Sequence, residues 1–186
     1  MNVRPEGLTL AEFPEWEAAQ QTKHEYVRGV VSPFPGGTLA RAKLAGEIYA
    51  SLLRQLRGTA FDAYVFDVMT VTPDSVRYPD VVVTRGERET RNPKQRTLTR
   101  PVLIVEVLSD STEADDRGAK FADYRSLASF EEYVLADSRR RRVERFRHEG
   151  GWAAEAAAST GRLRLGSLEA VLDIDELYDN AEIAAD

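Results

Sequence analysis

The sequence contains no cysteine and only two histidines, His24 and His148, among its 186 residues. Without cysteine the chain can form neither disulfides nor thiolate zinc sites, and a cytoplasmic location is expected. With so few histidines, a histidine-rich metal cage is also excluded. Any metal would therefore have oxygen ligands, which is the preference of Mg²⁺ and Mn²⁺.

Long apolar runs are also missing. None approaches the roughly 18 residues that a membrane-spanning helix requires. The N-terminal segment, MNVRPEGLTL, lacks the apolar core of a signal peptide. We therefore expect a soluble protein that has no membrane partner and is not exported.

The chain has no excess of positive charge, since its net charge is −6. This argues against a protein that mainly coats nucleic acid, although an enzyme can still meet DNA through a local basic surface. One candidate surface is the run Arg139, Arg140, Arg141 and Arg142 around an expected hairpin. The other is a loop that carries Arg85, Arg88, Arg91, Lys94, Arg96 and Arg100. Each run either contacts DNA phosphates or is a solvated loop or strand edge, where charge discourages edge-to-edge pairing.

Apolar residues make up 42% of the chain and charged residues 30%, which is typical of one globular domain of this length. Apolar periodicity and capping signals predict helices over residues 9–20, 39–58 and 113–127. Short apolar or alternating runs predict strands over residues 24–31, 61–71, 81–83, 102–105, 132–136, 142–147, 152–157 and 162–165. This mixture indicates an α/β protein with a mixed central β-sheet flanked by helices.

Glu106 interrupts the apolar segment 102–108, which is otherwise typical of a strand covered on both faces. A buried carboxylate without a partner costs several kcal/mol, so a cation must compensate it. That cation is either an arginine in a buried ion pair or a bound metal ion. Strand alternation places Ile104, Glu106 and Leu108 on the same face of the sheet.

Asp80 stands at the beginning of the other apolar strand, residues 81–83. Alone, Pro-Asp before a strand is a common turn signal. If the two apolar strands pair, however, Asp80 and Glu106 can bind one cation, and water or phosphate oxygens can complete its shell.

A cationic catalytic group would be expected two residues after Glu106, but Leu108 stands there. In the helix that follows, Asp116, Lys120 and Tyr124 recur every four residues and therefore share one face. Lys120 could reach back to stabilise a transition state or to position the attacking water. The alternative is a surface Asp116–Lys120 ion pair, worth only a few tenths of a kcal/mol.

Several segments resemble the Uma2 family of restriction endonucleases. They are residues 78–83 (YPDVVV), 105–112 (VEVLSDST), 116–124 (DRGAKFADY) and 131–137 (EEYVLAD). Residues 25–31 (EYVRGVV) and 36–40 (GGTLA) are similar too. The resemblance extends over about residues 10–178, so we expect a single domain over residues 1–186 with its core in that range.

The resemblance implies a restriction-endonuclease-like PD-(D/E)xK fold and a metal-dependent endonuclease that hydrolyses DNA phosphodiester bonds. Asp80 and Glu106 would bind Mg²⁺ or Mn²⁺, and Lys120 would match the lysine on the family's helix. Glu25 as an outer-shell ligand and Asp116 as a residue that positions Lys120 complete the candidate catalytic set. The resemblance also implies a homodimer.

The chain departs from the family pattern near the expected active site. Arg28 and Val30 flank Gly29 where an acidic pair is usual, and Arg41 stands where the long helix usually begins with histidine. We take Arg41 as a candidate DNA contact.

These departures favour an alternative, a catalytically inactive nuclease-fold protein that binds nucleic acid or another protein. A metal-free enzyme with two carboxylates, such as a glycosidase, is a second alternative. The apolar strands around both acids and the lysine on the following helix argue against it.

Overall fold

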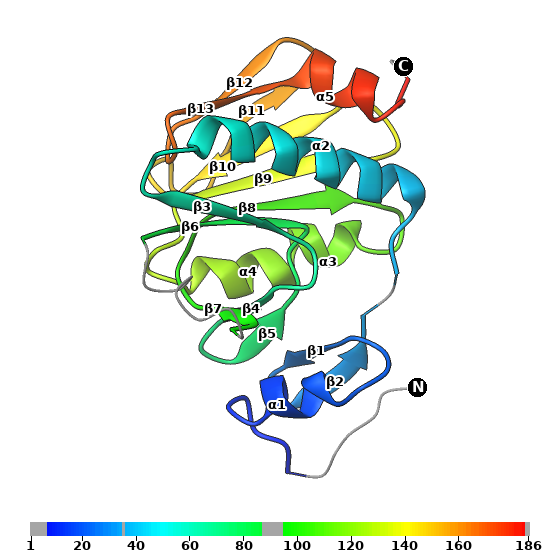
Figure 1. The fold of residues 1–186 in the computed structure, drawn as a ribbon, viewed down its shortest axis with the longest axis vertical. Coiled ribbons are helices and arrows are strands. Elements are labelled where there is room, and N and C mark those ends of the chain that lie inside the picture. The colour runs from blue at the N-terminus through cyan, green and yellow to red at the C-terminus, as the bar shows by residue number, and fades with distance from the viewer. Residues whose placement is uncertain (1–6, 35, 87–94, 185–186) are drawn as a thin grey trace.

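The computed structural model describes residues 7–34, 36–86 and 95–184. It has the predicted α/β architecture, with mixed β-sheets flanked by helices (Figure 1). Its helices are α1 (Phe13–Ala18), α2 (Leu39–Leu56), α3 (Glu113–Arg117), α4 (Ala119–Arg125) and α5 (Ile174–Asn180). Within the described ranges, no helix combines the length and the hydropathy that crossing a membrane requires.

The larger sheet has six strands in the order β11-β10-β9-β8-β6-β3. Their bounds are β3 (Phe61–Val65), β6 (Val81–Arg85), β8 (Pro101–Leu108), β9 (Glu132–Asp137), β10 (Val143–Arg147) and β11 (Ala154–Ala158). Strands β8 and β9 are parallel, and their other neighbours are antiparallel. Strands β8 and β9 occupy the middle of the sheet, and every residue of both is buried.

The second sheet has five short strands in the order β2-β1-β5-β4-β7 and lies beside α1 in the lower part of Figure 1. Their bounds are β1 (His24–Val27), β2 (Val30–Pro33), β4 (Met69–Val71), β5 (Ser75–Arg77) and β7 (Thr97–Leu98). A separate pair, β12 (Arg162–Leu165) and β13 (Ala170–Asp173), packs against α2 and α5. Residues 78–80 connect β5 of the second sheet to β6 of the larger one.

Two apolar clusters cover the opposite faces of β8. Leu103, Val105 and Val107 belong to the cluster that includes the buried faces of α2 and α5. Ile104 and Leu108 belong to the other cluster, with Phe121 and Tyr124 of α4 among its members. The prediction of central strands covered on both faces is therefore confirmed, and Glu106 points toward the α4 side.

Two predicted single strands were wrong, because left-handed backbone turns divide each of them. Residues 24–31 form the hairpin β1–β2, with Arg28 at φ 48° and Gly29 at φ 83° in its turn. Residues 61–71 form β3 and β4, separated by Phe66 at φ 48° and Asp67 at φ 60°. Phe66 and Asp67 carry the chain from one sheet to the other, and non-glycine residues at positive φ leave little signal in a sequence.

The predicted helix over residues 113–127 is also interrupted, at Gly118 (φ −111°, ψ −100°), which separates α3 from α4. The short elements β5, β7, β13 and α5 were not predicted at all. In the predicted basic loop, Arg88, Arg91 and Lys94 lie outside the described residues.

We predict that Gly118→Ala destabilises the protein by about 1–3 kcal/mol, the usual range for overpacking. A Cβ atom at residue 118 would lie 2.9 Å from the backbone oxygen of Ala114. The free energy of unfolding in urea measures the effect. Gly46→Ala, inside α2 with no atom within 4 Å of its new Cβ, is the matched control and should stabilise by up to about 1 kcal/mol. Equal values for the two variants would contradict the prediction.

Candidate functional site

Asp80 and Glu106 lie side by side where the second sheet joins the larger one. Strands β6 and β8 pair antiparallel with Val81 opposite Val105, so Asp80 falls beside Glu106. The backbone N–H of Val107 donates to Asp80 Oδ2 at 2.7 Å. Both carboxylates are buried, with Asp80 3% and Glu106 0% exposed. The structure thus brings together the two acidic residues that the sequence singled out.

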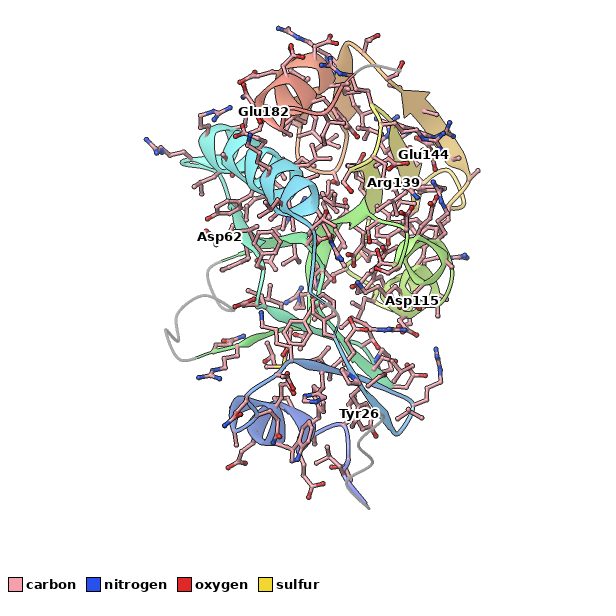
Figure 2. The ribbon with its side chains drawn as sticks, turned by 90° about the vertical axis from the view of Figure 1, so that its right-hand side faces the viewer. Tyr26, Asp62, Asp115, Arg139, Glu144 and Glu182 are labelled. Carbon is pink, nitrogen blue, oxygen red and sulfur yellow. The ribbon has the colours of Figure 1, made fainter. Side chains whose placement is uncertain are left out.

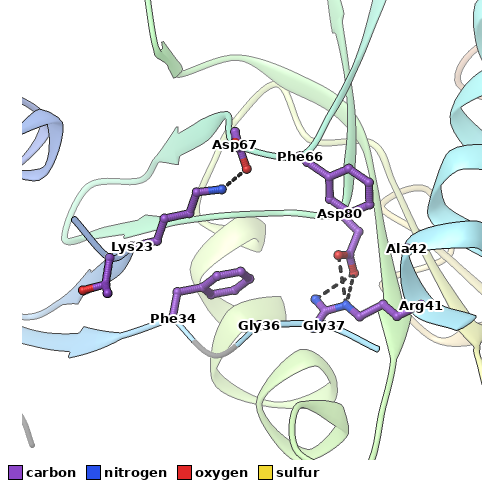
Figure 3. A pocket seen from close by; sticks show the side chains of 10 residues that line it. Lys23, Phe34, Gly36, Gly37, Arg41, Ala42, Phe66, Asp67 and Asp80 are labelled. Atoms are coloured by element: carbon purple, nitrogen blue, oxygen red, sulfur yellow. Dashed lines mark hydrogen bonds and ion pairs between the residues drawn. The ribbon is translucent and has the colours of Figure 1, made fainter. Parts of the chain in front are cut away.

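The partner of Asp80 is Arg41, in the first turn of α2. Its Nε donates to Oδ1 at 3.0 Å and to Oδ2 at 3.1 Å, and its Nη2 donates to Oδ2 at 2.9 Å (Figure 3). Thr38 caps the helix by accepting from the backbone N–H of Arg41 at 3.2 Å. Arg41 is 3% exposed, so its guanidinium faces Asp80 and not solvent. Its role as a DNA contact stays a prediction.

Glu106 has one satisfied oxygen and one unsatisfied oxygen. Oε1 accepts from Lys120 Nζ at 3.0 Å and from the Tyr124 hydroxyl at 2.9 Å. Oε2 has no hydrogen-bond partner among the described residues, and Arg41 Nη2 lies 4.0 Å away. Burial raises the pKa of Glu106 well above its ordinary value, and the charge of Lys120 opposes that shift.

Lys120 connects several acidic and polar groups. Besides Glu106, its Nζ lies 3.3 Å from Asp116 Oδ1 and donates to the backbone oxygen of Tyr78 at 3.3 Å. Of the two alternatives for Asp116 and Lys120, the surface ion pair is wrong, because both side chains are buried despite the helix break between them. Burial also raises the pKa of Asp116. Asp116 therefore contacts Lys120 directly, as a positioning residue would.

Glu25 belongs to a neighbouring network. Its Oε2 accepts from Arg77 Nη1 at 2.8 Å, and its Oε1 lies 3.9 Å from Lys120 Nζ. Arg77 Nε also donates to Asp123 Oδ2 at 2.8 Å, and Arg28 Nη2 donates to Asp123 Oδ1 at 2.6 Å. Sequence reasoning missed Arg77 and Asp123. The strand that carries Arg77 is too short to predict, and Asp123 lies in the segment 116–124, where the sequence pattern indicated no role for it.

The arginine run 139–142 is largely matched by carboxylates. Arg139 pairs with Asp137 at 2.8 Å, with Asp110 at 2.7 Å and with Glu113 at 2.5 Å. The other pairs are Arg140 with Asp137, Arg141 with Asp179, and Arg142 with Glu144. Figure 2 shows Arg139 and Glu144 on the same side of the molecule as Asp115. DNA binding by this run stays a prediction, and the carboxylates reduce its net positive charge.

A cavity of about 450 Å³ borders the Arg41–Asp80 pair. Its lining includes Phe34, Phe66 and the Lys23–Asp67 ion pair, which faces Arg41–Asp80 across the cavity in Figure 3. The buried acidic site therefore has open space beside Asp80.

The donor chemistry of Asp80 and Glu106 fits a small hard cation. Mg²⁺ commonly takes only one or two protein carboxylates, with water and substrate phosphate completing its shell. The unpartnered Glu106 Oε2 is an oxygen that a cation would satisfy. In the described part of the chain, no group of three or more His, Cys, Asp or Glu side chains is placed to hold a metal. Any metal site here consequently rests on two carboxylates, and Arg41 already binds one of them.

Comparison with known proteins supplies relatives. The sequence profile of the Uma2 family, described as "Putative restriction endonuclease", matches residues 10–174. An uncharacterised protein of Synechocystis sp. is 29% identical over 175 residues, covering 92% of this chain and 91% of that protein. A second one from the same organism is 30% identical over 145 residues, covering 77% and 82%.

A solved structure from Anabaena variabilis has the same fold. That protein is described as "a putative nuclease belonging to DUF820", and its structure superposes with a TM-score of 0.76 over 94% of this chain and 99% of that chain. At 16% sequence identity, this likeness establishes the fold alone.

We predict that Arg77→Ala destabilises the protein by about 3–5 kcal/mol, because it removes the arginine partner of the buried Glu25 and leaves the buried Asp123 with Arg28 alone. Denaturant unfolding measures this loss. Arg54→Ala, which removes an exposed arginine paired with Glu176 at 3.5 Å, should change stability by less than about 0.5 kcal/mol. A loss for Arg77→Ala no larger than the Arg54→Ala loss would contradict the prediction.

The raised pKa of Glu106 predicts a pH dependence of stability in metal-free buffer. Below the ordinary pKa of 4.5, the group is protonated in both the folded and the unfolded states. Between pH 4.5 and the higher pKa of the folded state, the unfolded state has lost the proton that the folded state keeps. The contribution of Glu106 to stability therefore decreases over this range and is lost once pH has risen through the folded pKa. The free energy of unfolding of the native protein relative to Glu106→Gln should therefore fall as pH rises above 4.5.

Glu113→Gln is the matched control with the opposite sign. Hydrogen bonds from Arg117 and Arg139 lower the pKa of Glu113 below its ordinary value of 4.5. Its contribution to stability is present above pH 4.5 and is lost as pH falls through the lowered pKa. The same pH slope for both variants would show that burial does not raise the pKa of Glu106.

Proposed function

The chain belongs to the Uma2 restriction endonuclease family, and from this membership and the geometry of the site we propose that it is a metal-dependent endonuclease that hydrolyses DNA phosphodiester bonds. The observation that carries the proposal is the buried pair Asp80 and Glu106, with Lys120 Nζ 3.0 Å from Glu106. Membership by itself supports a nuclease of this class. The site supports the finer statement about metal and substrate.

Asp80 and Glu106 would hold Mg²⁺ or Mn²⁺ through oxygens of both carboxylates. Such an ion, when bound, polarises the scissile phosphate and lowers the pKa of a coordinated water. Tyr124 and Lys120 both donate to Glu106 Oε1, so they orient the carboxylate and leave Oε2 free for the cation. A cation bound to Oε2 would thereby offset the free-energy cost of burying Glu106.

Lys120 would supply a fixed positive charge. Burial by itself lowers the pKa of this ammonium, but the carboxylates of Glu106 and Asp116 outweigh it and raise the pKa above its ordinary value. Lys120 consequently stays protonated and stabilises negative charge that develops on the phosphate. Asp116 Oδ1 at 3.3 Å and Glu25 Oε1 at 3.9 Å from Lys120 Nζ would act as positioning residues.

One observation favours a second candidate, the catalytically inactive nuclease-fold protein. The guanidinium of Arg41 satisfies both oxygens of Asp80, which is how a structural ion pair is made. That candidate binds nucleic acid or protein without cleavage under any divalent ion. The homodimer stays a prediction for both candidates.

We predict that the purified protein cleaves plasmid or branched DNA in the presence of Mg²⁺ or Mn²⁺. Glu106→Gln should abolish cleavage because it removes a charged metal ligand. Lys120→Met should lower the rate by about 10²–10³, the usual effect of losing one group that stabilises transition-state charge. Gel assays of nicking and linearisation measure both effects.

Asp62→Asn is the matched control, because it removes an exposed carboxylate on β3 outside the site. It should cleave like the native protein, and a chelator should stop both. Folded protein that leaves every DNA substrate intact with either ion would favour the inactive binding protein instead. Cleavage that survives the chelator would exclude the metal.

A further inference from the structure

The Arg41 guanidinium supplies at Asp80 the positive charge that a bound metal ion would supply. Its fork makes three hydrogen bonds to the two Asp80 oxygens, at 2.9–3.1 Å, and its Nη2 lies 4.0 Å from the unsatisfied Glu106 Oε2. The guanidinium therefore stands between the two carboxylates proposed to hold the metal. It is buried, and an arginine cannot lose its charge by deprotonation.

The charges around Asp80 argue against a metal ion and the Arg41 guanidinium binding there together. Three buried carboxylates, Asp80, Glu106 and Asp116, meet two cations, Lys120 and Arg41. A divalent ion at Asp80 would more than neutralise the one negative charge in excess, and it would lie beside the buried Arg41 guanidinium. Like charges at short range in a buried site repel strongly.

We propose that Arg41 and the divalent metal compete for Asp80, so that metal binds only when the Arg41 side chain leaves the carboxylate. This inference rests on the proposed function for the identity of the competing cation. Arg41 is thus the residue that sets the metal affinity of the site. In the arrangement described above, the site is closed to metal by its own side chain.

The structure provides a place for the displaced side chain. The cavity of about 450 Å³ begins at Arg41 and Asp80, and the Arg41 guanidinium lies 6.0 Å from the ring of Phe34, which also lines it. Gly37 lies against the stem of Arg41: a Cβ at this position would be 3.2 Å from Arg41 Cδ. The absence of that Cβ leaves the stem room to turn.

In the cavity, the guanidinium would face solvent at the entrance to the acidic site. A phosphate group that approaches Asp80 and Glu106 would meet it there, and arginine binds phosphate through the same fork that binds a carboxylate. Without metal, Arg41 would occupy Asp80 and exclude the ion. With metal bound, the displaced Arg41 would bind the phosphate of the substrate. Metal and nucleic acid should therefore enhance each other's binding.

The first test is Mn²⁺ binding without DNA, followed by calorimetry. Arg41→Gln should bind Mn²⁺ at least tenfold more tightly than the native protein. Lys43→Gln is the matched control: Lys43 lies on the same helix and pairs with Glu182 at 2.7 Å at the surface. Its affinity should equal that of the native protein. Adding Asp80→Asn to Arg41→Gln should cancel the gain, because the competition takes place at Asp80.

The second test uses the native protein, in case Arg41→Gln does not fold. The Nε–H groups of Arg41 and Arg77 both donate to buried carboxylates and can be followed by NMR. Titration with Mg²⁺ should shift or broaden the Arg41 signal and leave the Arg77 signal in place. An Arg41 signal that stays unmoved over the whole range in which the protein remains folded would overturn the proposal.

These readouts separate the inference from the proposed function. Tighter Mn²⁺ binding by Arg41→Gln without any DNA cleavage would sustain the competition and reject the nuclease. Cleavage by the native protein with equal Mn²⁺ affinity in Arg41→Gln would sustain the nuclease and reject the competition. Failure of both proteins to bind Mn²⁺ would overturn the inference outright.

Discussion

The burial of Glu106 in the central strand β8 is the constraint on which the rest of the site depends. Apolar clusters cover both faces of that strand, so the carboxylate cannot be satisfied by bulk water. It is satisfied on one oxygen only, by Lys120 and Tyr124 from α4. The packing of α4 against the sheet brings Lys120 and Tyr124 to this side chain, and the pairing of β6 with β8 brings Asp80 beside it.

Charged pairs also join the second sheet to the helices. Arg77 of β5 binds Glu25 of β1 and Asp123 of α4, and Arg28 from the β1–β2 turn reaches Asp123 as well. Buried ion pairs often contribute little net stability, because desolvation offsets their attraction. Such a concentration of them is more typical of a functional site than of a core built for stability. The ion pairs that join the second sheet to α4 therefore lie next to the candidate site and include one of its residues, Glu25.

Membership of the Uma2 family and the two arginines at unusual positions have to be understood together. Arg28 contributes to the ion-pair network, where it contacts Asp74 and Asp123. Arg41 contributes to the acidic pair itself. Both stand where the resemblance described above implies other groups, and both are paired with carboxylates. Under the proposed function, Arg41 controls the affinity of the site for metal; in the inactive alternative, Arg41 stands where a metal would otherwise bind. The measured affinity for metal decides between the two.

Much of the fold could be predicted from local pattern. Apolar runs located β6 and β8, helical periodicity located α2, and a charged residue in an apolar strand identified Glu106, because each signal lies within a few neighbouring residues. The turns at Arg28-Gly29 and Phe66-Asp67 were missed, since backbone conformation there is set by the sheets on either side. The Arg41–Asp80 pair joins residues 39 positions apart, and the packing of α2 against the sheet alone brings them together. The sequence by itself determined that Glu106 is buried in an apolar strand; the tertiary structure decided which cations it and Asp80 meet, because that depends on distances that no local pattern encodes.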